Sequence, residues 1–394
     1  MNEVKSKITR RPTWTVKAGS LSIGSEHPIA VQSMCATRTQ DIDATLSQIM
    51  LLKEHGADII RVAIDSKKDI EALKIIRSKL DLLDTSTNLV VDLQESYRLA
   101  SAVAPYVNKI RYNPGHLFHH EKSVSVFDKV KHIVQAARDF DCAVRIGVNF
   151  GSLDPSQAES AESSYEAALN SVAEHLDIMK QLEFENFVVS LKSSDPNDVI
   201  DINNAFAERH PRIPLHLGVT EAGMLPMGEI KSRIAFENLI IKGIGDTLRV
   251  SLTLPYAEKY QEILIGKKII EDVQAGRFRS VPRFVNEGLN IISCPSCSRV
   301  ENEAFIDLAK KVKEISKYAE QENITIAVMG CRVNGPGETD DADLGLWCAP
   351  KHVNFKKRGE LIGAFSYEEI LDKFKIELDN IISDKKATQI AGNM

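Results

Sequence analysis

Short apolar runs alternate with longer amphipathic stretches over the first 276 residues of the chain, and this alternation limits the possible folds most strongly. Eight runs predict strands, at 28–34, 58–64, 88–93, 109–114, 143–149, 187–194, 214–220 and 246–252. The stretches between them have helical periodicity, clearest at 163–184, where Tyr165, Leu169 and Val172 share one face. Eight strand–helix units in about 250 residues predict a closed (β/α)8 TIM barrel of buried parallel strands.

The pattern changes near residue 277, where Arg277, Arg279, Pro282 and Arg283 indicate a linker. Beyond it, the sequence predicts strands near 289–293, 324–330, 344–348 and 359–365, a helix near 300–321 and a last helix at the end. We therefore expect a barrel domain over residues 1–276 and a smaller α/β domain over residues 277–394, which is large enough to hold its own core.

Composition and charge exclude several classes of function. The chain has 394 residues, of which 43% are hydrophobic and 26% charged, and its formal net charge is −6. Because no lysine-rich run or basic aromatic platform is present, no nucleic acid is expected as a partner. The basic N-terminal segment is not followed by the apolar run of a signal peptide, and no stretch is long and apolar enough for a membrane span. These features predict no membrane partner and a cytoplasmic enzyme.

The six cysteines are expected to be thiols or metal ligands rather than a disulfide framework. Cys294 and Cys297 form a C-x-x-C pair, and Cys331 and Glu338 lie in a second segment, MGCRVNGPGE. Three thiolates from two segments suit three corners of an iron–sulfur cluster. A weak oxygen ligand such as Glu338 would hold the fourth iron and yield to substrate, which makes the iron a Lewis acid as well as an electron donor.

Other uses of these cysteines stay open on spacing alone. Structural zinc would need a fourth ligand, which would be Cys348 or His352. A redox C-x-x-C pair is conceivable, but no thioredoxin-like pattern surrounds it. The spacing favours the cluster over zinc, and it leaves Cys35, Cys142 and Cys348 as ordinary buried thiols.

Polar side chains interrupt or follow the apolar strands of the expected barrel. They are Arg61, Asp92, Arg111, Asn113, Arg145, Asn149, Lys192, His216, Glu221, Arg249 and Ser251. Buried charges are costly when unpaired, so five cations in barrel strands indicate a bound anion or neutralising carboxylates. Active sites of such barrels lie at the C-terminal ends of the strands, and arginine favours phosphate oxygens. The simplest ligand is a small molecule with two phosphates, and His216 near Glu221 is a candidate acid–base group or substrate anchor.

The chain resembles the 4-hydroxy-3-methylbut-2-enyl diphosphate synthase family in motifs that run along most of its length. The shared motifs are PIAVQSM, GADIIRVAI, KIRYNPG, RIGVNFGSL, SLKSSD, HLGVTEAG, GIGDTLRVSLT, SCPSCSR and MGCRVNGPGE with ADLG. The resemblance implies the two-electron reductive ring opening and dehydration of 2-C-methyl-D-erythritol 2,4-cyclodiphosphate to hydroxymethylbutenyl diphosphate. This reaction belongs to the methylerythritol phosphate route to isoprenoids.

The resemblance also implies the cofactor, the site residues and the partners. It implies one 4Fe–4S cluster per chain, held by Cys294, Cys297, Cys331 and Glu338. It places the diphosphate on Arg61, Arg111, Arg145, Asn149, Lys192, Arg249 and Ser251, and it implies Glu338, Glu262 and His216 as catalytic residues. A ferredoxin or flavodoxin is implied as electron donor. A head-to-tail homodimer is implied as well, in which the cluster of one subunit caps the barrel of the other.

Some residues depart from the family pattern near the expected barrel mouth. Gln94 stands where the family usually has a histidine, Cys35 follows QSM where the family favours threonine, and His116 follows NPG. These changes keep two alternatives open. One is a diverged paralogue that acts on another phosphorylated substrate, and the other is a zinc-containing phosphate-binding barrel with non-redox or regulatory activity.

Overall fold

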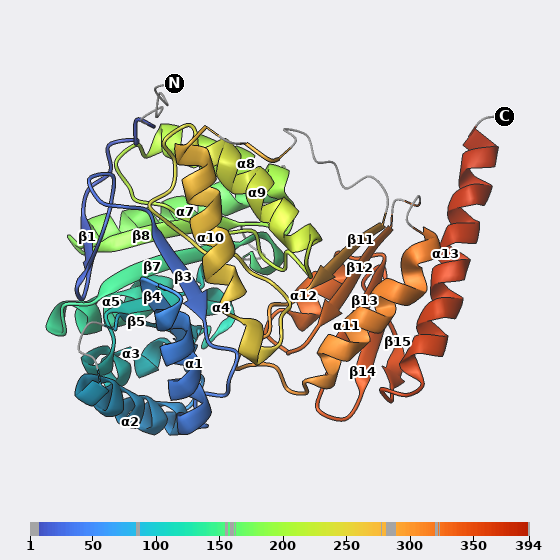
Figure 1. Cartoon of the computed structure of the whole chain (residues 1–394), viewed down its shortest axis with the longest axis horizontal. Coiled ribbons are helices and arrows are strands. Elements are labelled where there is room, and N and C mark those ends of the chain that lie inside the picture. The colour runs from blue at the N-terminus through green and yellow to red at the C-terminus, as the bar shows by residue number, and fades with distance from the viewer. Residues whose placement is uncertain are drawn as a thin grey trace.

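Two sheets organise the chain (Figure 1). The computed structural model describes residues 8–83, 87–153, 157, 161, 163–276, 278–280, 289–319, 322 and 324–392. An eight-stranded sheet occupies the N-terminal part, and a five-stranded sheet the C-terminal part. Of the expected linker, Arg277, Pro282 and Arg283 lie outside the described residues.

The first sheet is the predicted barrel. Its strands are β3 (Ala30–Met34), β4 (Ile59–Ala63), β5 (Leu89–Gln94), β6 (Lys109–Tyr112), β7 (Ala143–Asn149), β8 (Phe187–Lys192), β9 (His216–Leu217) and β10 (Thr247–Leu248). All pair in parallel, in the order β8-β7-β6-β5-β4-β3-β10-β9. A parallel bridge between Val189 of β8 and Leu215, next to β9, closes the ring. The (β/α)8 prediction is therefore confirmed.

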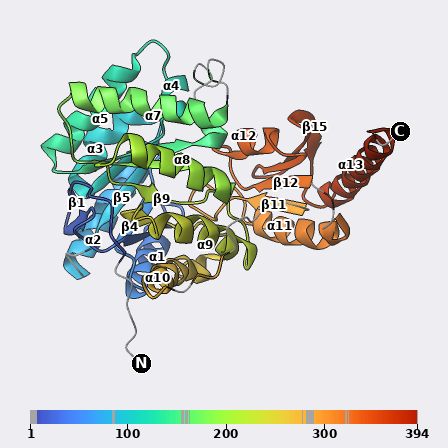
Figure 2. The same cartoon turned by 90° about the horizontal axis from the view of Figure 1, so that it is seen from above.

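Helices follow the barrel strands and cover the outside of the barrel (Figures 1 and 2). They are α1 (Ile42–Glu54), α2 (Lys67–Leu83), α3 (Ala100–Val103), α5 (Val126–Asp139), α7 (Ser164–Gln181), α8 (Pro196–Arg209), α9 (Met227–Ile240) and α10 (Gln261–Gln274), and a short helix α4 (Pro114–His119) follows β6. Successive strand side chains alternate between the helices and the barrel interior. Arg61, Asp92, Arg111 and Arg145 share the inward alternation, because they pair in register or two residues apart across neighbouring strands.

An N-terminal hairpin closes one mouth of the barrel. Its strands, β1 (Val16–Ala18) and β2 (Leu21–Ile23), are too short to show a hydrophobic period, so the sequence did not predict them. The hairpin and the first inward strand positions form one apolar cluster of Val16, Ala18, Ile23, Ile59, Val90, Ala143 and Val188. This layer seals the N-terminal end of the barrel and leaves the opposite mouth for a polar site.

The C-terminal unit has its own sheet and its own core. The sheet order is β11 (Leu289–Ser293), β12 (Ile324–Met329), β13 (Leu344–Cys348), β14 (Val353–Lys357) and β15 (Glu360–Phe365), with the first three strands parallel. Helices α11 (Ala304–Ile315) and α13 (Ile370–Gly392) bury apolar side chains against it. A short helix, α12 (Gly335–Asp340), precedes β13. The smaller α/β unit is confirmed, and β14 is the strand that the sequence missed.

A buried histidine makes the stability of the barrel depend on pH. The Tyr112 hydroxyl on β6 lies 2.9 Å from Nδ1 of His175 on α7. Burial lowers the pKa of His175 to about 3, whereas an unfolded histidine titrates near 6.5. Between pH 6.5 and about pH 3 the histidine is protonated in the unfolded state but neutral in the folded state. The free energy of unfolding therefore decreases as the pH falls through this range. We expect a loss of about 1.4 kcal/mol per pH unit between the two pKa values.

Urea unfolding of the ligand-free protein at pH 6.5 and pH 4.5 measures this effect. His175→Gln keeps a polar partner for Tyr112 and cannot titrate, so the variant should lose stability less steeply than the parent chain. Equal slopes for the two proteins would contradict the prediction.

Candidate active site

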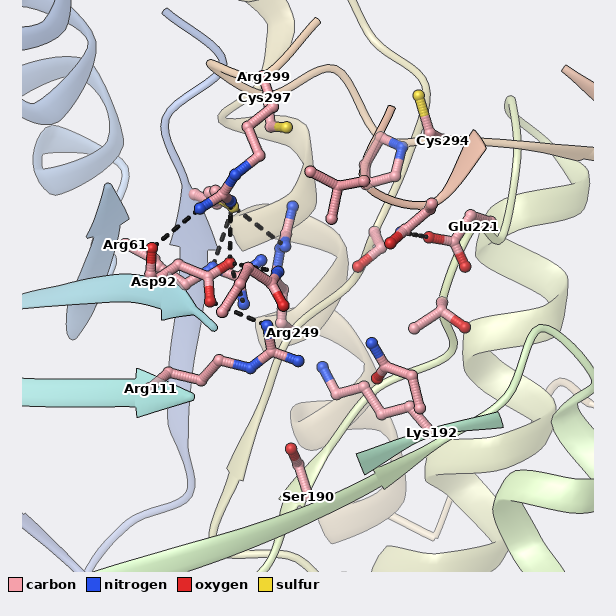
Figure 3. Close-up of a pocket in the computed structure, with 18 of the residues that line it drawn as sticks. Arg61, Asp92, Arg111, Ser190, Lys192, Glu221, Arg249, Cys294, Cys297 and Arg299 are labelled. Carbon is pink, nitrogen blue, oxygen red and sulfur yellow. Dashed lines mark hydrogen bonds and ion pairs between the residues drawn. The ribbon is translucent and has the colours of Figure 1, made fainter. Parts of the chain in front are cut away.

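A pocket at the C-terminal ends of the barrel strands is roofed by the C-terminal unit (Figure 3). It brings together ten of the thirteen residues that the family resemblance assigns to the cofactor, the substrate and catalysis. These are Arg61, Arg111, Arg145, Asn149, Lys192, Arg249 and Ser251 of the barrel, and Cys294, Cys297 and Cys331 of the roof. The phosphate-binding and thiol groups therefore face one cavity, although they come from two separate sheets.

The pocket is strongly cationic. Six cations line it, Arg61, Arg111, Arg145, Lys192, Arg249 and Arg299, together with only two carboxylates, Asp92 and Glu221. Such an excess of buried positive charge is stabilised by a polyanion, and guanidinium groups match phosphate oxygens.

Asp92 on β5 organises three of the arginines. Arg111 Nη1 lies 2.9 Å from Asp92 Oδ1, Arg299 Nη1 lies 3.1 Å from Oδ2, and Arg61 is 3.8 Å away. Figure 3 shows the three guanidinium groups turned toward this carboxylate. Although burial opposes ionisation, Arg111, Arg61 and Arg299 together hold the pKa of Asp92 well below its usual range. Asp92 therefore stays charged and fixes the arginines in place.

Other cationic nitrogens have no hydrogen-bond partner within the described part of the chain. They include Nε and Nη1 of Arg145, Nε and Nη2 of Arg249, and Nε of Arg111. Burial, followed by the neighbouring arginines, lowers the pKa of Arg145 and of Lys192. Buried donors without partners are costly, so these groups are poised for an anionic ligand.

Local backbone features make room for this arrangement. A Cβ atom on Gly147 would collide with Arg111 Nε, and one on Gly218 would lie 2.5 Å from Lys192 Nζ. Gln94 and Glu221 line the pocket with φ angles of 51° and 47°, in the left-handed region that side chains rarely adopt. Such backbone strain is concentrated at functional sites.

The three cysteines follow two neighbouring parallel strands. Cys294 comes directly after β11, Cys297 follows in the next turn, and Cys331 comes two residues after β12. The carboxyl ends of parallel strands meet at one edge of a sheet, which brings the three thiols to the pocket. The Gly330 amide donates to Cys294 Sγ at 3.0 Å. Burial raises the pKa of Cys331 to about 12, so ligation of a metal there would release a proton.

This donor set fits an iron–sulfur cluster better than a single metal ion. Among the described residues, no three cysteine, histidine or carboxylate groups are close enough to hold one ion. The thiols of a cluster bind different irons, so they lie further apart than the ligands of one ion. Neither Cys348 nor His352 lines the pocket, so the zinc alternative lacks the fourth ligand that the sequence offered it.

Comparisons with known proteins agree with this division of the site. The GcpE TIM-barrel domain matches residues 13–267, and the GcpE protein C-terminal domain matches residues 290–380. The chain belongs to the GcpE family. The first match contains the cationic groups of the barrel, and the second contains the three cysteines.

Two relatives of this GcpE chain are similar over almost their full length. One, from Rhodopirellula baltica, is 59% identical over 382 residues, which cover 96% of this chain and 99% of the relative. Another, from Nautilia profundicola, is 38% identical over 373 residues, which cover 94% of this chain and 98% of the relative. Both carry the name 4-hydroxy-3-methylbut-2-en-1-yl diphosphate synthase (flavodoxin).

Within the described part of the GcpE chain, we find no helix with the length and apolarity that a membrane crossing requires.

Three residues that the sequence singled out lie outside the pocket lining of the GcpE site. Glu338, on α12, lies against Gly151 of the barrel and next to the Glu221 carboxylate, whose Oε1 accepts a hydrogen bond from Asn334 at 2.7 Å. Burial and the Glu221 carboxylate raise the pKa of Glu338 well above its usual range. His216 lies inside the barrel, where its Nδ1 contacts the Thr247 hydroxyl. Burial, followed by Lys192, lowers the pKa of His216 well below 6.5, so its ring is neutral.

The third residue, Glu262, is fully buried on α10. Its carboxylate accepts hydrogen bonds from Lys259 and from the Leu252 amide, both at 2.8 Å, and from Ser33 at 2.7 Å. It also lies 3.8 Å from Arg249 Nε. Glu262 therefore contacts the pocket only through Arg249, which is the behaviour of a positioning residue.

Sequence reasoning missed one cation of the site. Arg299 pairs with Asp65 at 2.8 Å and with Asp92 at 3.1 Å, and it joins the C-terminal unit to the barrel. Its sequence signal is its place two residues after Cys297, at the end of the motif SCPSCSR. That signal becomes informative only when the cysteines are known to face the arginine-rich barrel mouth.

Proposed function

We propose that the chain catalyses the two-electron reductive ring opening and dehydration of 2-C-methyl-D-erythritol 2,4-cyclodiphosphate. The product is (E)-4-hydroxy-3-methylbut-2-enyl diphosphate of the methylerythritol phosphate pathway. Counted as neutral acids, the substrate takes up two electrons and two protons, one ring C–O bond breaks, and one water leaves. The observation that carries the proposal is a single pocket in which six cations face three thiols. The names of the relatives and their identity over nearly the whole chain favour this reaction over that of a diverged paralogue.

The barrel residues are proposed to bind and orient the diphosphate. In this proposal residues 1–276 form the substrate-binding domain. Arg61, Arg111, Arg145, Lys192 and Arg249 pair with phosphate oxygens, and Asn149 and Ser251 donate hydrogen bonds. This field would stabilise the negative charge that collects on the diphosphate when the C–O bond breaks.

The remaining barrel residues are proposed to keep those groups in place. Asp92 holds Arg61 and Arg111. Gln94, which stands where the family usually has a histidine, donates a hydrogen bond to Asp92 at 3.1 Å and so helps to fix this carboxylate. Glu262 positions Arg249. The neutral His216 is fully buried against Thr247 and near Lys192, so it would act on the substrate through the pocket residues that it supports.

The C-terminal domain, residues 277–394, is proposed to hold one 4Fe–4S cluster per chain. Cys294, Cys297, Cys331 and Glu338 would be its ligands. When bound, the cluster would supply electrons one at a time and an iron that acts as a Lewis acid. Glu338 would have to turn from the neighbouring Glu221 carboxylate toward the iron. The C-terminal domain also covers the barrel mouth and limits the access of water to the pocket.

A flavodoxin is the proposed electron donor because both relatives carry that word in their names, and a ferredoxin is the second candidate.

We further propose a head-to-tail homodimer. In the single chain, the cysteines face the barrel mouth of the same chain, so each chain holds a complete set of residues. Mixing an inactive barrel variant with an inactive cysteine variant decides between the arrangements. Restored turnover would support sites shared between chains, and no restoration would oppose them.

Anaerobic turnover tests the proposed function. Protein reconstituted with iron and sulfide is given the cyclodiphosphate and a chemically reduced viologen dye, and the product is identified by mass. We expect the hydroxymethylbutenyl diphosphate. A chain that holds the cluster and binds the substrate but forms no product would refute the proposed reaction.

A further inference from the structure

A second cavity lies between helix α9 of the barrel and strand β11 and helix α11 of the C-terminal domain. Figure 2 shows the end of α9 facing β11 and α11. The described lining contains three lysines, Lys231, Lys313 and Lys317, and no carboxylate. Apolar side chains, among them Met227 and Ile291, complete it. We call this cavity the lysine groove.

The lysine groove is part of the folded interface rather than a gap beside it. Lys231 of α9 is buried, and its Nζ donates to Asn290 Oδ1 of β11 at 2.8 Å, which ties the two walls together. Lys317 is exposed and Lys313 is half-buried, so both lysines lie at the rim of the groove. Met227 is 38% exposed at the same place. The groove thus offers an adaptable apolar floor under positive charges.

The back wall of the lysine groove adjoins the proposed cluster. Ser293, the last residue of β11, lines the groove, and the next residue, Cys294, lines the substrate pocket. Adjacent Cα atoms are about 3.8 Å apart, so a partner seated in the groove comes within one residue of a cluster ligand. Thr253 of the barrel fixes this wall, because its hydroxyl donates to the Cys294 carbonyl oxygen at 3.1 Å.

We propose that the lysine groove is the docking site of the electron donor, a small flavoprotein with an acidic surface around its flavin. The inference rests on the proposed function. Lys313 and Lys317 place positive charge on the rim, above the buried Lys231, on a chain with a net charge of −6. Complementary charge steers a transient partner to such a face. Redox encounters use small interfaces, which a groove of this kind provides. Each encounter would pass one electron from the donor to a cluster held by Cys294, Cys297 and Cys331, and two encounters would supply the two electrons of one turnover.

The test compares two donors on the cluster-loaded enzyme. Lys313→Glu combined with Lys317→Glu reverses the charge of the rim without touching the substrate pocket. We expect the KM for reduced flavodoxin to rise at least tenfold, while turnover with the reduced viologen dye stays within twofold of the parent enzyme. Lys67→Glu combined with Lys68→Glu makes the same charge change on the first turn of α2 and should leave both activities unchanged.

The outcomes separate failure of the groove from failure of the proposed function. If the parent enzyme turns over with neither donor, the proposed function fails. If viologen turnover persists and the flavodoxin KM of the groove variant is unchanged, the groove is not the docking site. A change in oligomeric state with an unchanged KM would instead assign the groove to a second copy of this chain and overturn the proposal.

Salt dependence of the parent enzyme gives a second measurement that needs no variant. Flavodoxin-driven kcat/KM should fall at least fivefold between low and physiological ionic strength, because salt screens the attraction between the charged surfaces. Viologen-driven turnover should change much less. A flavodoxin-driven rate that does not depend on salt would overturn the electrostatic docking, even if the double variant failed to fold.

Discussion

The Cys331→Ser chain is expected to lose its iron–sulfur cluster and its reductive activity. Cys331 is one of three thiols at the pocket, and a hydroxyl binds iron much more weakly than a thiolate. After anaerobic reconstitution we expect an iron content far below four per chain and a viologen-driven kcat reduced at least a thousandfold. Iron analysis and the visible absorption spectrum measure the first effect, and product formation the second.

Cys348→Ser is the matched control. Cys348 is also buried at the end of a strand, but it does not line the pocket. This variant should keep the cluster and most of the activity, with some loss of stability. If loss of iron followed Cys348→Ser instead of Cys331→Ser, the assignment of the cluster ligands would be wrong. Stoichiometric zinc in place of iron would support the zinc-containing barrel.

The Arg145→Met chain is expected to be more stable than the parent chain and almost inactive. Arg145 is 1% exposed, and its Nε and Nη1 have no hydrogen-bond partner within the described residues. Replacing a buried, incompletely paired cation by an apolar side chain of similar length removes a desolvation cost. We expect the Tm of the ligand-free protein to rise by about 2 °C or more. We expect kcat/KM to fall by about 100-fold or more, since a charge-assisted bond to phosphate is lost.

Differential scanning fluorimetry with and without the cyclodiphosphate measures the Tm of the parent and variant proteins and the increase in Tm on ligand binding. The parent protein should be stabilised by the ligand, and the variant should not. Arg233→Met is the control, because buried Arg233 is paired with Glu229, Glu237 and Asp272 at 2.8–3.1 Å. Breaking that network should destabilise the protein by about 3–5 kcal/mol. A lowered Tm for Arg145→Met would show that Arg145 serves the fold rather than the substrate.

Much of the barrel could be predicted because its signals are local. A strand buried on both faces is a short continuous apolar run, and 28–34 and 143–149 were visible for that reason. The inward cations were visible as interruptions of such runs. The hairpin β1–β2 was missed because strands of three residues carry too little hydrophobic period to be recognised. Strand β14 was missed because its sequence, VNFKK, contains only two apolar residues.

The barrel, the smaller α/β unit, the cationic strands and the cysteine spacing are all encoded by residues close together in the chain. How these groups meet in space follows from the folded structure. It placed Arg299 against Asp92, put Glu262 behind Arg249, set His216 beneath the pocket, and opened the lysine groove beside Cys294. Arg249 and Glu262 are 13 residues apart in the sequence, and Asp92 and Arg299 are 207 residues apart. No local sequence pattern encodes which of the many buried charges meet. Arg249 meets Glu262 because the barrel closes around them, and Arg299 meets Asp92 because the C-terminal unit packs on the barrel mouth. Both kinds of contact depend on the whole fold.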